Sequence, residues 1–483
     1  MERMEEYVRR ALDTAAARGA AYADARAVDL TVGSVSVKTG SIGAVTGRES
    51  RGLGVRALVA GAWGFAATAE ITPVAIDRAA AGAVEIARAS ASVPGRRVDL
   101  GPAVARRASY RTPVERDPFT VPLEEKIALL MEADRRMRAV PGVTTTTGQI
   151  VWQRERKTFG NTEGALVEQE LFETGCGIGA TAVGHGEAQN RSYPNSFRHQ
   201  MTRGYEMVTE LDLAGQATRV GEEAVALLTA RQCPRDLTTT LILDSSQLAL
   251  QIHESCGHPI ELDRVYGTEL DFAGGSFLSV GELGHLRYGS EQVNIYADAT
   301  IPGGLGTFGY DDEGVPARRA PIVKDGLFVG YLTDRQYAQR LGVPDIGAAR
   351  ASGWDRAPLV RMTNVSIEPG EWRFADLIAD TDDGIYMETN RSWSIDDQRR
   401  NFQFGTEIAY EIKGGKRGDL LKNATYTGIT PQFWNSMDAI CDRDHYVVWG
   451  TPNCGKGRPY QIMHTGHGAA PARFRNVRVG VVR

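Results

Sequence analysis

Hydrophobic and polar positions follow two alternating periods along the first part of the chain. Apolar residues recur at helical spacing from Met4 to Ala15, and Gly19 follows them. Residues 23–72 change to a Val-, Thr- and Gly-rich sequence with period-2 alternation, which predicts antiparallel strands joined by glycine turns. Thr72 and Pro73 then form a capping pair that predicts the start of a second helix.

The same order of helix, strands and helix repeats further along. Residues 122–140 have an amphipathic helical pattern, and residues 143–184 again indicate a meander of strands. Residues 205–231 are predicted to be helical. Because helices and antiparallel strands occur in separate blocks, the sequence predicts an α+β fold for this half.

A second domain is expected after Pro234. Residues 237–243 predict a strand, and Ser245 or Ser246 is expected to cap a helix. After Pro259 the pattern shows short apolar runs and glycine turns, with no long helix. The 483 residues also exceed the roughly 250–300 that one core supports.

The predicted architecture is therefore an N-terminal α+β meander domain followed by a mostly antiparallel β domain with one central helix. The first domain covers residues 1–234 and could divide further into 1–100 and 110–234. The second covers residues 235–483.

Composition narrows the functional classes. The net charge of -5 gives no reason to expect nucleic acid or an anionic membrane as a partner. No apolar run reaches the roughly 20 residues of a membrane span, and the N-terminus lacks a secretory apolar region. Five sparse cysteines favour a reducing compartment over a disulfide framework. We expect a cytoplasmic protein.

The stretch QIHESCGHPIELD, from Gln251 to Asp263, carries the clearest candidate chemistry. The H-E-x-x-H pattern of zinc proteases places two histidines four residues apart on one helical face. Here His253 and His258 are five apart and would point about 140° away from each other on a regular α-helix. The spacing alone therefore also fits two histidines that are solvated or packed in the core and share no metal.

The neighbours of His258 change this interpretation. Gly257 weakens the helix, and Pro259 disfavours the α conformation at the residue before it. We therefore expect the helix to break or to widen into a π-type turn between Glu254 and Pro259, which lets His258 swing toward His253. Glu254 would then flank the metal as a general base without being a ligand.

A catalytic zinc site usually needs a third protein ligand. Cys256 is expected to point into the core. His464 and His467, three residues apart in MHTGHG, are candidates. Cys454 in TPNCGKGRP is another, because a polar glycine loop with a neighbouring lysine should give an accessible thiol with a lowered pKa. Cys176 and Cys233 read as structural.

Several segments together resemble the TldD/PmbA metallopeptidase family, and its TldD-type subunit in particular. The family pattern H-E-x-x-G-H-x-x-E-x-D is matched by residues 253–263. Further resemblances are RGLGVRALVAGAWGFAAT from Arg51, DDEGVPARRAPIVKDGLFVGYLTDR from Asp311, RMTNVSIEPGE from Arg361, DGIYMET from Asp383, FGTEIAYEIKGGK from Phe404, CGKGRP from Cys454 and ARFRNVRVG from Ala472. They occur in order along nearly the whole chain.

This resemblance implies a zinc peptidase with His253, His258 and Cys454 as metal ligands and Glu254 as catalytic base. It implies unfolded or extended peptides and proteins as substrates, cleaved inside a closed chamber. It also implies a homodimer, or a heterodimer with a related PmbA/TldE-type subunit that lacks the motif. His464 and His467 depart from the family, whose members tend to carry smaller residues there.

Two other functions remain open from the sequence. One is a non-catalytic, metal-stabilised assembly or binding subunit, which would have no use for Glu254. The other is a metal hydrolase that acts on a small amide in a biosynthetic pathway. The natural substrate, the cleavage specificity, and the groups that bind substrate or stabilise the oxyanion are not readable from the spacing of residues.

Overall fold

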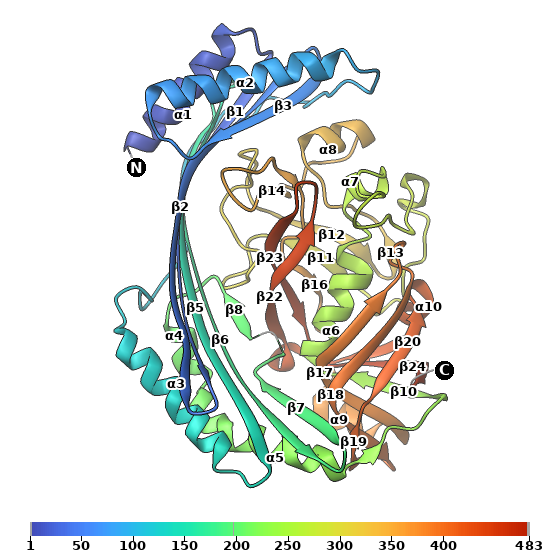
Figure 1. Cartoon of the computed structure of the whole chain (residues 1–483). Coiled ribbons are helices and arrows are strands. Elements are labelled where there is room, and N and C mark those ends of the chain that lie inside the picture. Colours follow the sequence, from blue (N-terminus) through green and yellow to red (C-terminus); the bar gives the residue numbers. More distant parts are fainter. Residues whose placement is uncertain (1, 197, 481–483) are drawn as a thin grey trace.

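The computed structural model describes residues 2–196 and 198–480. A long, mostly antiparallel sheet curves around the C-terminal half of the chain (Figure 1). Its strands are β1 (Tyr22–Lys38), β2 (Ser41–Val59), β3 (Ala62–Thr68), β4 (Arg107–Arg111), β5 (Val143–Asn161), β6 (Leu166–Gly184), β7 (Glu187–Tyr193) and β8 (His199–Met201). Their order is β3-β2-β1-β5-β6-β4, and β7 and β8 also pair with β6.

Helices cover the two ends of this sheet. They are α1 (Glu2–Ala17), α2 (Pro73–Ala91), α3 (Leu123–Arg138), α4 (Glu206–Glu210) and α5 (Leu213–Thr229). Figure 1 shows α1 and α2 at one end and the other three at the opposite end. Separate hydrophobic cores form under the two groups. A 19-residue strand spans about 60 Å, so β5 and β6 reach from one core to the other.

The N-terminal helices follow the sequence prediction. Thr72 caps α2 by accepting a hydrogen bond from the Ala75 N–H at 3.3 Å, as expected. The helical stretch predicted over 205–231 forms two helices, because the chain breaks between α4 and α5. Asp212 adopts a left-handed conformation (φ 43°) there and caps α5 through the Gly215 N–H, so its side chain favours a new helix start over continuation.

The C-terminal half contains a closed β-barrel. Its sheet comprises β9 (Arg231–Gln232), β10 (Leu237–Leu243), β17 (Asp383–Ile395), β18 (Asn401–Lys413), β19 (Lys416–Lys422), β20 (Thr425–Ile429), β21 (Met437–Ile440) and β24 (Ala472–Val479). The order β17-β10-β24-β20-β18 closes because β18 pairs back with β17. Only β10–β17 and β9–β19 are parallel, which confirms the mostly antiparallel prediction for the described residues.

Smaller sheets and short helices fill the rest of this half. The strands are β11 (Ile295–Asp298), β12 (Arg319–Lys324), β13 (Leu327–Phe328), β14 (Ala349–Arg350), β15 (Leu359–Val360), β16 (Val365–Ile367), β22 (Val447–Lys456) and β23 (Gln461–Ala469). The α-helices after Pro259 are α7 (Leu262–Val265), α8 (Arg335–Leu341), α9 (Phe374–Ala379) and α10 (Thr430–Asn435). None of these described helices exceeds seven residues, which confirms the expected lack of a long one.

Helix α6 (Ser245–Ile252) is the central helix that the sequence predicted. It contacts β17 of the barrel on one side and β23 on the other. Leu248 and Ile252 are fully buried in the large C-terminal core. The expected cap at Ser245 or Ser246 is wrong by one position, since Asp244 accepts a hydrogen bond from the Ser246 N–H at 2.8 Å. The domain boundary at residue 234 stays a prediction.

Across residues 2–196 and 198–480, no helix combines the length and apolar character required for a membrane span.

Candidate metal centre

The helix that carries the motif widens at His253. Helix α6 passes directly into a π-helix, η1 (His253–Gly257), and the His258 N–H donates to the His253 carbonyl five residues earlier at 3.1 Å. A Cβ at Gly257 would lie 2.1 Å from the Met362 sulfur, so any larger residue would force that side chain to move. The predicted widening between Glu254 and Pro259 is confirmed. It places His253 and His258 on the same side, with ring centroids 4.8 Å apart.

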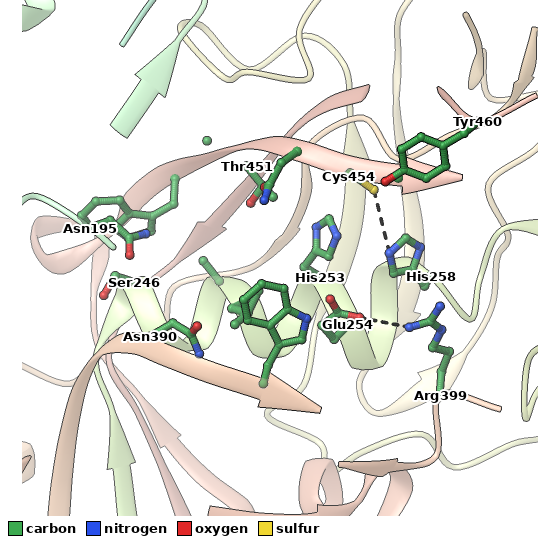
Figure 2. Close-up of a pocket in the computed structure, with 17 residues that line it drawn as sticks. Asn195, Ser246, His253, Glu254, His258, Asn390, Arg399, Thr451, Cys454 and Tyr460 are labelled. Atoms are coloured by element: carbon green, nitrogen blue, oxygen red, sulfur yellow. Dashed lines mark hydrogen bonds and ion pairs between the residues drawn. The ribbon is translucent and has the colours of Figure 1, made fainter. Parts of the chain in front are cut away.

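Three of the predicted site residues meet at one point. One donor atom each from His253, His258 and Cys454 lies within 4.8 Å of the others, and all three residues are buried. The Cys454 Sγ atom is 3.8 Å from His258 Nε2 (Figure 2). The histidines come from the widened helix, whereas the cysteine comes from the neighbouring strand β22.

Cys454 differs from its prediction in one respect. It lies in β22 with 3% of its surface exposed, so the expected open access in a loop is wrong. Pairing of β22 with β23 makes this stretch a hairpin strand in which Cys454 is on the buried side. Burial alone would raise the pKa of the thiol, but Arg361 and His258 outweigh it and hold the pKa below its usual value, as expected. The Arg361 guanidinium also donates to the Cys454 carbonyl at 2.5 Å.

The hydrogen bond of His258 leaves Nε2 free for a metal. Its Nδ1 lies 3.2 Å from a Glu261 carboxylate oxygen, which can only accept when ionised. Burial alone would raise the pKa of Glu261, but Lys456 and Arg264 hold it well below its usual value. His258 therefore carries its proton on Nδ1, and Nε2 points toward Cys454 with its lone pair available.

A second chain of hydrogen bonds fixes His253. The Nδ1 atom of His467 lies 2.9 Å from the Val365 carbonyl, so that nitrogen must carry a proton. Burial lowers the pKa of His467, which keeps the ring neutral and makes its Nε2 an acceptor. His253 Nδ1, 2.7 Å away, therefore donates to His467. The lone pair of His253 sits on Nε2, the nitrogen left for a metal.

Buried ion pairs tie the motif to the strand that carries Cys454. The Lys456 ammonium lies 2.7 Å from Asp263 and 3.4 Å from Glu261, and all three side chains are almost completely buried. Arg264 adds a contact to Glu261 at 3.1 Å. Because Lys456 is two residues from Cys454, this network fixes the position of the thiol relative to the histidines.

Glu254 lies beside the cluster without belonging to it. Its side chain is 8% exposed, and its carboxylate is 3.3 Å from the Arg399 guanidinium. Both residues line a cavity of about 230 Å³ together with His253, His258 and Cys454. Figure 2 shows the carboxylate and the metal-binding atoms at the same end of this cavity. The other labelled residues that line it are Asn195, Ser246, Asn390, Thr451 and Tyr460.

The remaining ligand candidates lie elsewhere. His464 Nδ1 lies 2.5 Å from the Glu173 carboxylate and outside the cluster. His467 also lies outside it and contacts His253 through Nδ1 of that ring. Cys256 is fully buried in the C-terminal core, and burial raises the pKa of its thiol to about 12. Cys176 and Cys233 are buried in the cores as well, in agreement with the structural assignment.

Comparison with known proteins agrees with this geometry. Three parts of one family match the sequence: PmbA/TldA metallopeptidase domain 1 over residues 23–87, the central domain over 116–231, and the C-terminal domain over 237–480. A protein named "Metalloprotease" from Methanothermobacter thermautotrophicus is 30% identical over 95% of this chain and 95% of its own length. The chain belongs to the PmbA/TldD metallopeptidase family.

Two further relatives bear on the type of member. A "Zinc metalloprotease TldD homolog" from Saccharolobus solfataricus is 26% identical over 50% of this chain and 51% of its own length. The structure of TldE from Thermococcus kodakarensis covers 99% of this chain and 100% of its own, with a TM-score of 0.76 and 16% identity. At that identity the likeness shows the fold alone. The His–His–Cys cluster identifies the chain as a TldD-type member of the PmbA/TldD family.

The structure adds two residues to the site of this metallopeptidase that the sequence did not select. Arg399 lies 145 residues after Glu254, in a turn with no recognisable spacing to the motif. His467 was considered only as a ligand, whereas in the structure it orients the His253 imidazole. The His464–His467 pair was the one sequence feature that drew attention to His467, and its spacing did not reveal the hydrogen-bond partner of either ring.

Replacing His467 is expected to weaken metal binding. His467→Ala removes the acceptor that orients His253, and loss of such a partner typically lowers metal affinity by about 10–100-fold. His467→Gln should recover part of this loss, because its amide oxygen can accept the same hydrogen bond. Affinity can be measured by competition with a chromophoric chelator.

His464→Ala is the matched control for this measurement, since His464 lies on the same strand and contacts Glu173 instead. It should leave the affinity unchanged. Wild-type affinity in a folded His467→Ala variant would show that His253 needs no such partner.

Proposed function

We propose that this protein is a zinc-dependent peptidase that hydrolyses peptide bonds in unfolded or extended polypeptides. The proposal rests on Glu254, a buried carboxylate that faces the cavity beside three convergent metal-binding groups yet is not one of them. A purely structural metal site has no need for such a group. The family and its relatives named as metalloproteases support the same activity.

The donor atoms fit zinc. Two neutral imidazole nitrogens and one thiolate are typical zinc ligands, and three protein ligands leave one position open for chemistry. Tetrahedral geometry with ordinary Zn–N and Zn–S bonds separates N and S by about 3.6 Å, close to the 3.8 Å between His258 Nε2 and Cys454 Sγ. Zinc bound there would act as a Lewis acid that lowers the pKa of water and polarises the scissile carbonyl.

Glu254 supplies the proton transfers in this proposal. As a carboxylate it takes a proton from the attacking water, and it returns that proton to the amine that leaves. Its position one residue after His253 holds the carboxylate at the metal end of the cavity (Figure 2). His467 and Glu261 orient the two imidazoles, and burial lowers the pKa of both rings, which favours their neutral form.

The substrate is proposed to bind as an extended strand along β22. Among the described strands, β22 pairs only with β23. Six of its residues line the cavity: Trp449, Gly450, Thr451, Asn453, Cys454 and Gly455. An extended peptide can add to such a strand through main-chain hydrogen bonds, which are independent of side-chain sequence. Folded proteins expose few extended segments that could pair in this way.

Metal analysis combined with a cleavage assay tests the proposal. The purified chain should contain about one zinc per site and should cleave a reduced, unfolded polypeptide while the folded form of the same polypeptide resists. Glu254→Gln serves as the inactive reference. A zinc-loaded chain that cleaves no peptide but hydrolyses small amides would favour the biosynthetic alternative, and one that hydrolyses neither would favour an assembly subunit.

Assembly into a dimer is expected if the catalytic chamber is closed by a second subunit. Obligate contacts bury more than about 2,000 Å². The partner is proposed to be a second copy or a related subunit of the TldE type, to which this fold is similar. Light scattering of the chain alone and with that subunit measures this. An active monomer would contradict a chamber made from two subunits.

A further inference from the structure

Arg399 is held at the cavity by a strained turn between β17 and β18. Its backbone is left-handed, with φ 60°, a conformation that residues with a side chain rarely adopt. The Arg399 N–H donates to the Asp396 carbonyl at 2.9 Å, and its own carbonyl accepts from the Thr430 hydroxyl at 2.9 Å. Strain of this kind persists where the surroundings fix one conformation, often at functional sites.

The guanidinium has fewer partners than it can bind. Nη1 lies 3.3 Å from Glu254, and Nη2 donates to the Ala273 carbonyl at 2.9 Å. Nε is buried and has no acceptor among the described residues. The side chain is only 16% exposed. Arg399 is therefore a poorly hydrated cation beside the proposed base, and water screens its charge weakly.

We propose that Arg399 stabilises the negative charge that develops on the scissile carbonyl oxygen. The inference rests on the peptidase function proposed above. When water attacks, a C–O bond forms, the carbonyl π pair moves onto oxygen, and the proton goes to Glu254. Glu254 is then neutral, so Arg399 loses its counter-ion at the moment when the oxyanion appears.

The charge balance reverses when the intermediate collapses. The oxygen pair restores the carbonyl, the C–N bond breaks, and the proton on Glu254 passes to the leaving nitrogen. Glu254 becomes anionic again and pairs with Arg399. The cation is thus compensated in the ground state and available in the transition state, which is the differential interaction that raises kcat.

Two other roles fit the cavity less well. A substrate carboxylate anchored by Arg399 would lie next to the Glu254 carboxylate, which already compensates that cation. Tyr460, whose hydroxyl also faces the cavity in Figure 2, is half exposed and lies on the Cys454 side. Its phenol is neutral, so protonation of Glu254 would not free a positive charge there to stabilise the oxyanion.

Arg399→Gln tests the proposal in the zinc-loaded chain. The variant should lose about 10²–10³-fold in kcat, the usual effect of removing one oxyanion donor. KM for an unfolded peptide and zinc content should stay close to wild type. A phosphonamidate peptide, which mimics the tetrahedral anion, should bind more weakly by a similar factor in calorimetry. Arg399→Lys keeps the charge and should recover part of both losses.

Arg400→Gln is the matched control, because it removes the same charge from the exposed neighbouring position. It should behave as wild type. A raised KM with unchanged kcat in Arg399→Gln would make Arg399 a substrate anchor, and joint loss of zinc and thermal stability would make it structural. Unchanged phosphonamidate affinity would also overturn the proposal.

These outcomes separate the two proposals. If wild type and Arg399→Gln cleave peptide equally well, only the role of Arg399 fails. If wild type cleaves no peptide, both the peptidase function and the role of Arg399 fail.

Discussion

Glu254→Gln is expected to reduce peptide turnover by at least about 10²–10⁴-fold while metal content and melting temperature stay nearly unchanged. Glutamine keeps the size of the side chain, and its amide oxygen can still accept a hydrogen bond from Arg399, 3.3 Å away. It cannot accept a proton from water. Because Glu254 lies outside the His–His–Cys cluster, the metal should remain. Mass spectrometry of cleavage products and elemental analysis measure the two effects separately.

Glu291→Gln provides the comparison for this experiment, since its exposed carboxylate pairs only with Arg287 at the surface in the described structure. It should keep full activity. Full activity in Glu254→Gln would end the proposed mechanism. Loss of zinc in that variant would instead make Glu254 a metal ligand.

Local features of the sequence explain why the widened helix could be predicted. The five-residue spacing of the histidines conflicts with a regular helix, and Gly257 and Pro259 lie within the same turn. The irregular histidine spacing and the residues that widen the helix therefore lie within a few positions of each other. The strand Leu237–Leu243 was predicted with its observed bounds for a similar reason, because its Thr- and Leu-rich run is bounded by turn residues.

Long-range contacts explain what the sequence did not reveal. Cys454 lies 196 residues from His258, and the local composition could not choose between it and the other third-ligand candidates. The resemblance to the TldD/PmbA family singled it out. Closure of the barrel depends on the pairing of β17 with both β10 and β18, which no local pattern encodes. The Arg399 turn is strained, and local propensity does not predict strain.

The buried ion pairs show how remote residues cooperate at the site. Glu261 both orients His258 and binds Lys456, and Lys456 belongs to the strand that carries Cys454. Asp263 also pairs with Lys456. Two acidic residues of the motif therefore position the proposed ligands from both chain segments. Sequence matching identified these acids without indicating this role.

Cys454→Ala is expected to abolish both metal binding and peptide cleavage. The substitution removes one of the three proposed protein donors, and the remaining imidazoles cannot replace a thiolate. Metal affinity should fall further than the about 10–100-fold expected for residues that merely orient a ligand. Elemental analysis after dialysis, followed by a cleavage assay with added zinc, measures the loss. His253→Ala should behave in the same way.

Cys256→Ala distinguishes a ligand from a buried cysteine of the same motif. Cys256 is fully buried between the two histidines in sequence, yet it lies outside the cluster. The variant should lower thermal stability through lost packing while it keeps zinc and measurable activity. If Cys454→Ala retained full zinc while Cys256→Ala lost it, the assignment of the third ligand would be reversed. If both variants lost zinc and both were partly unfolded, the loss would instead show that the β22–β23 hairpin no longer packs against the helix that carries the histidines.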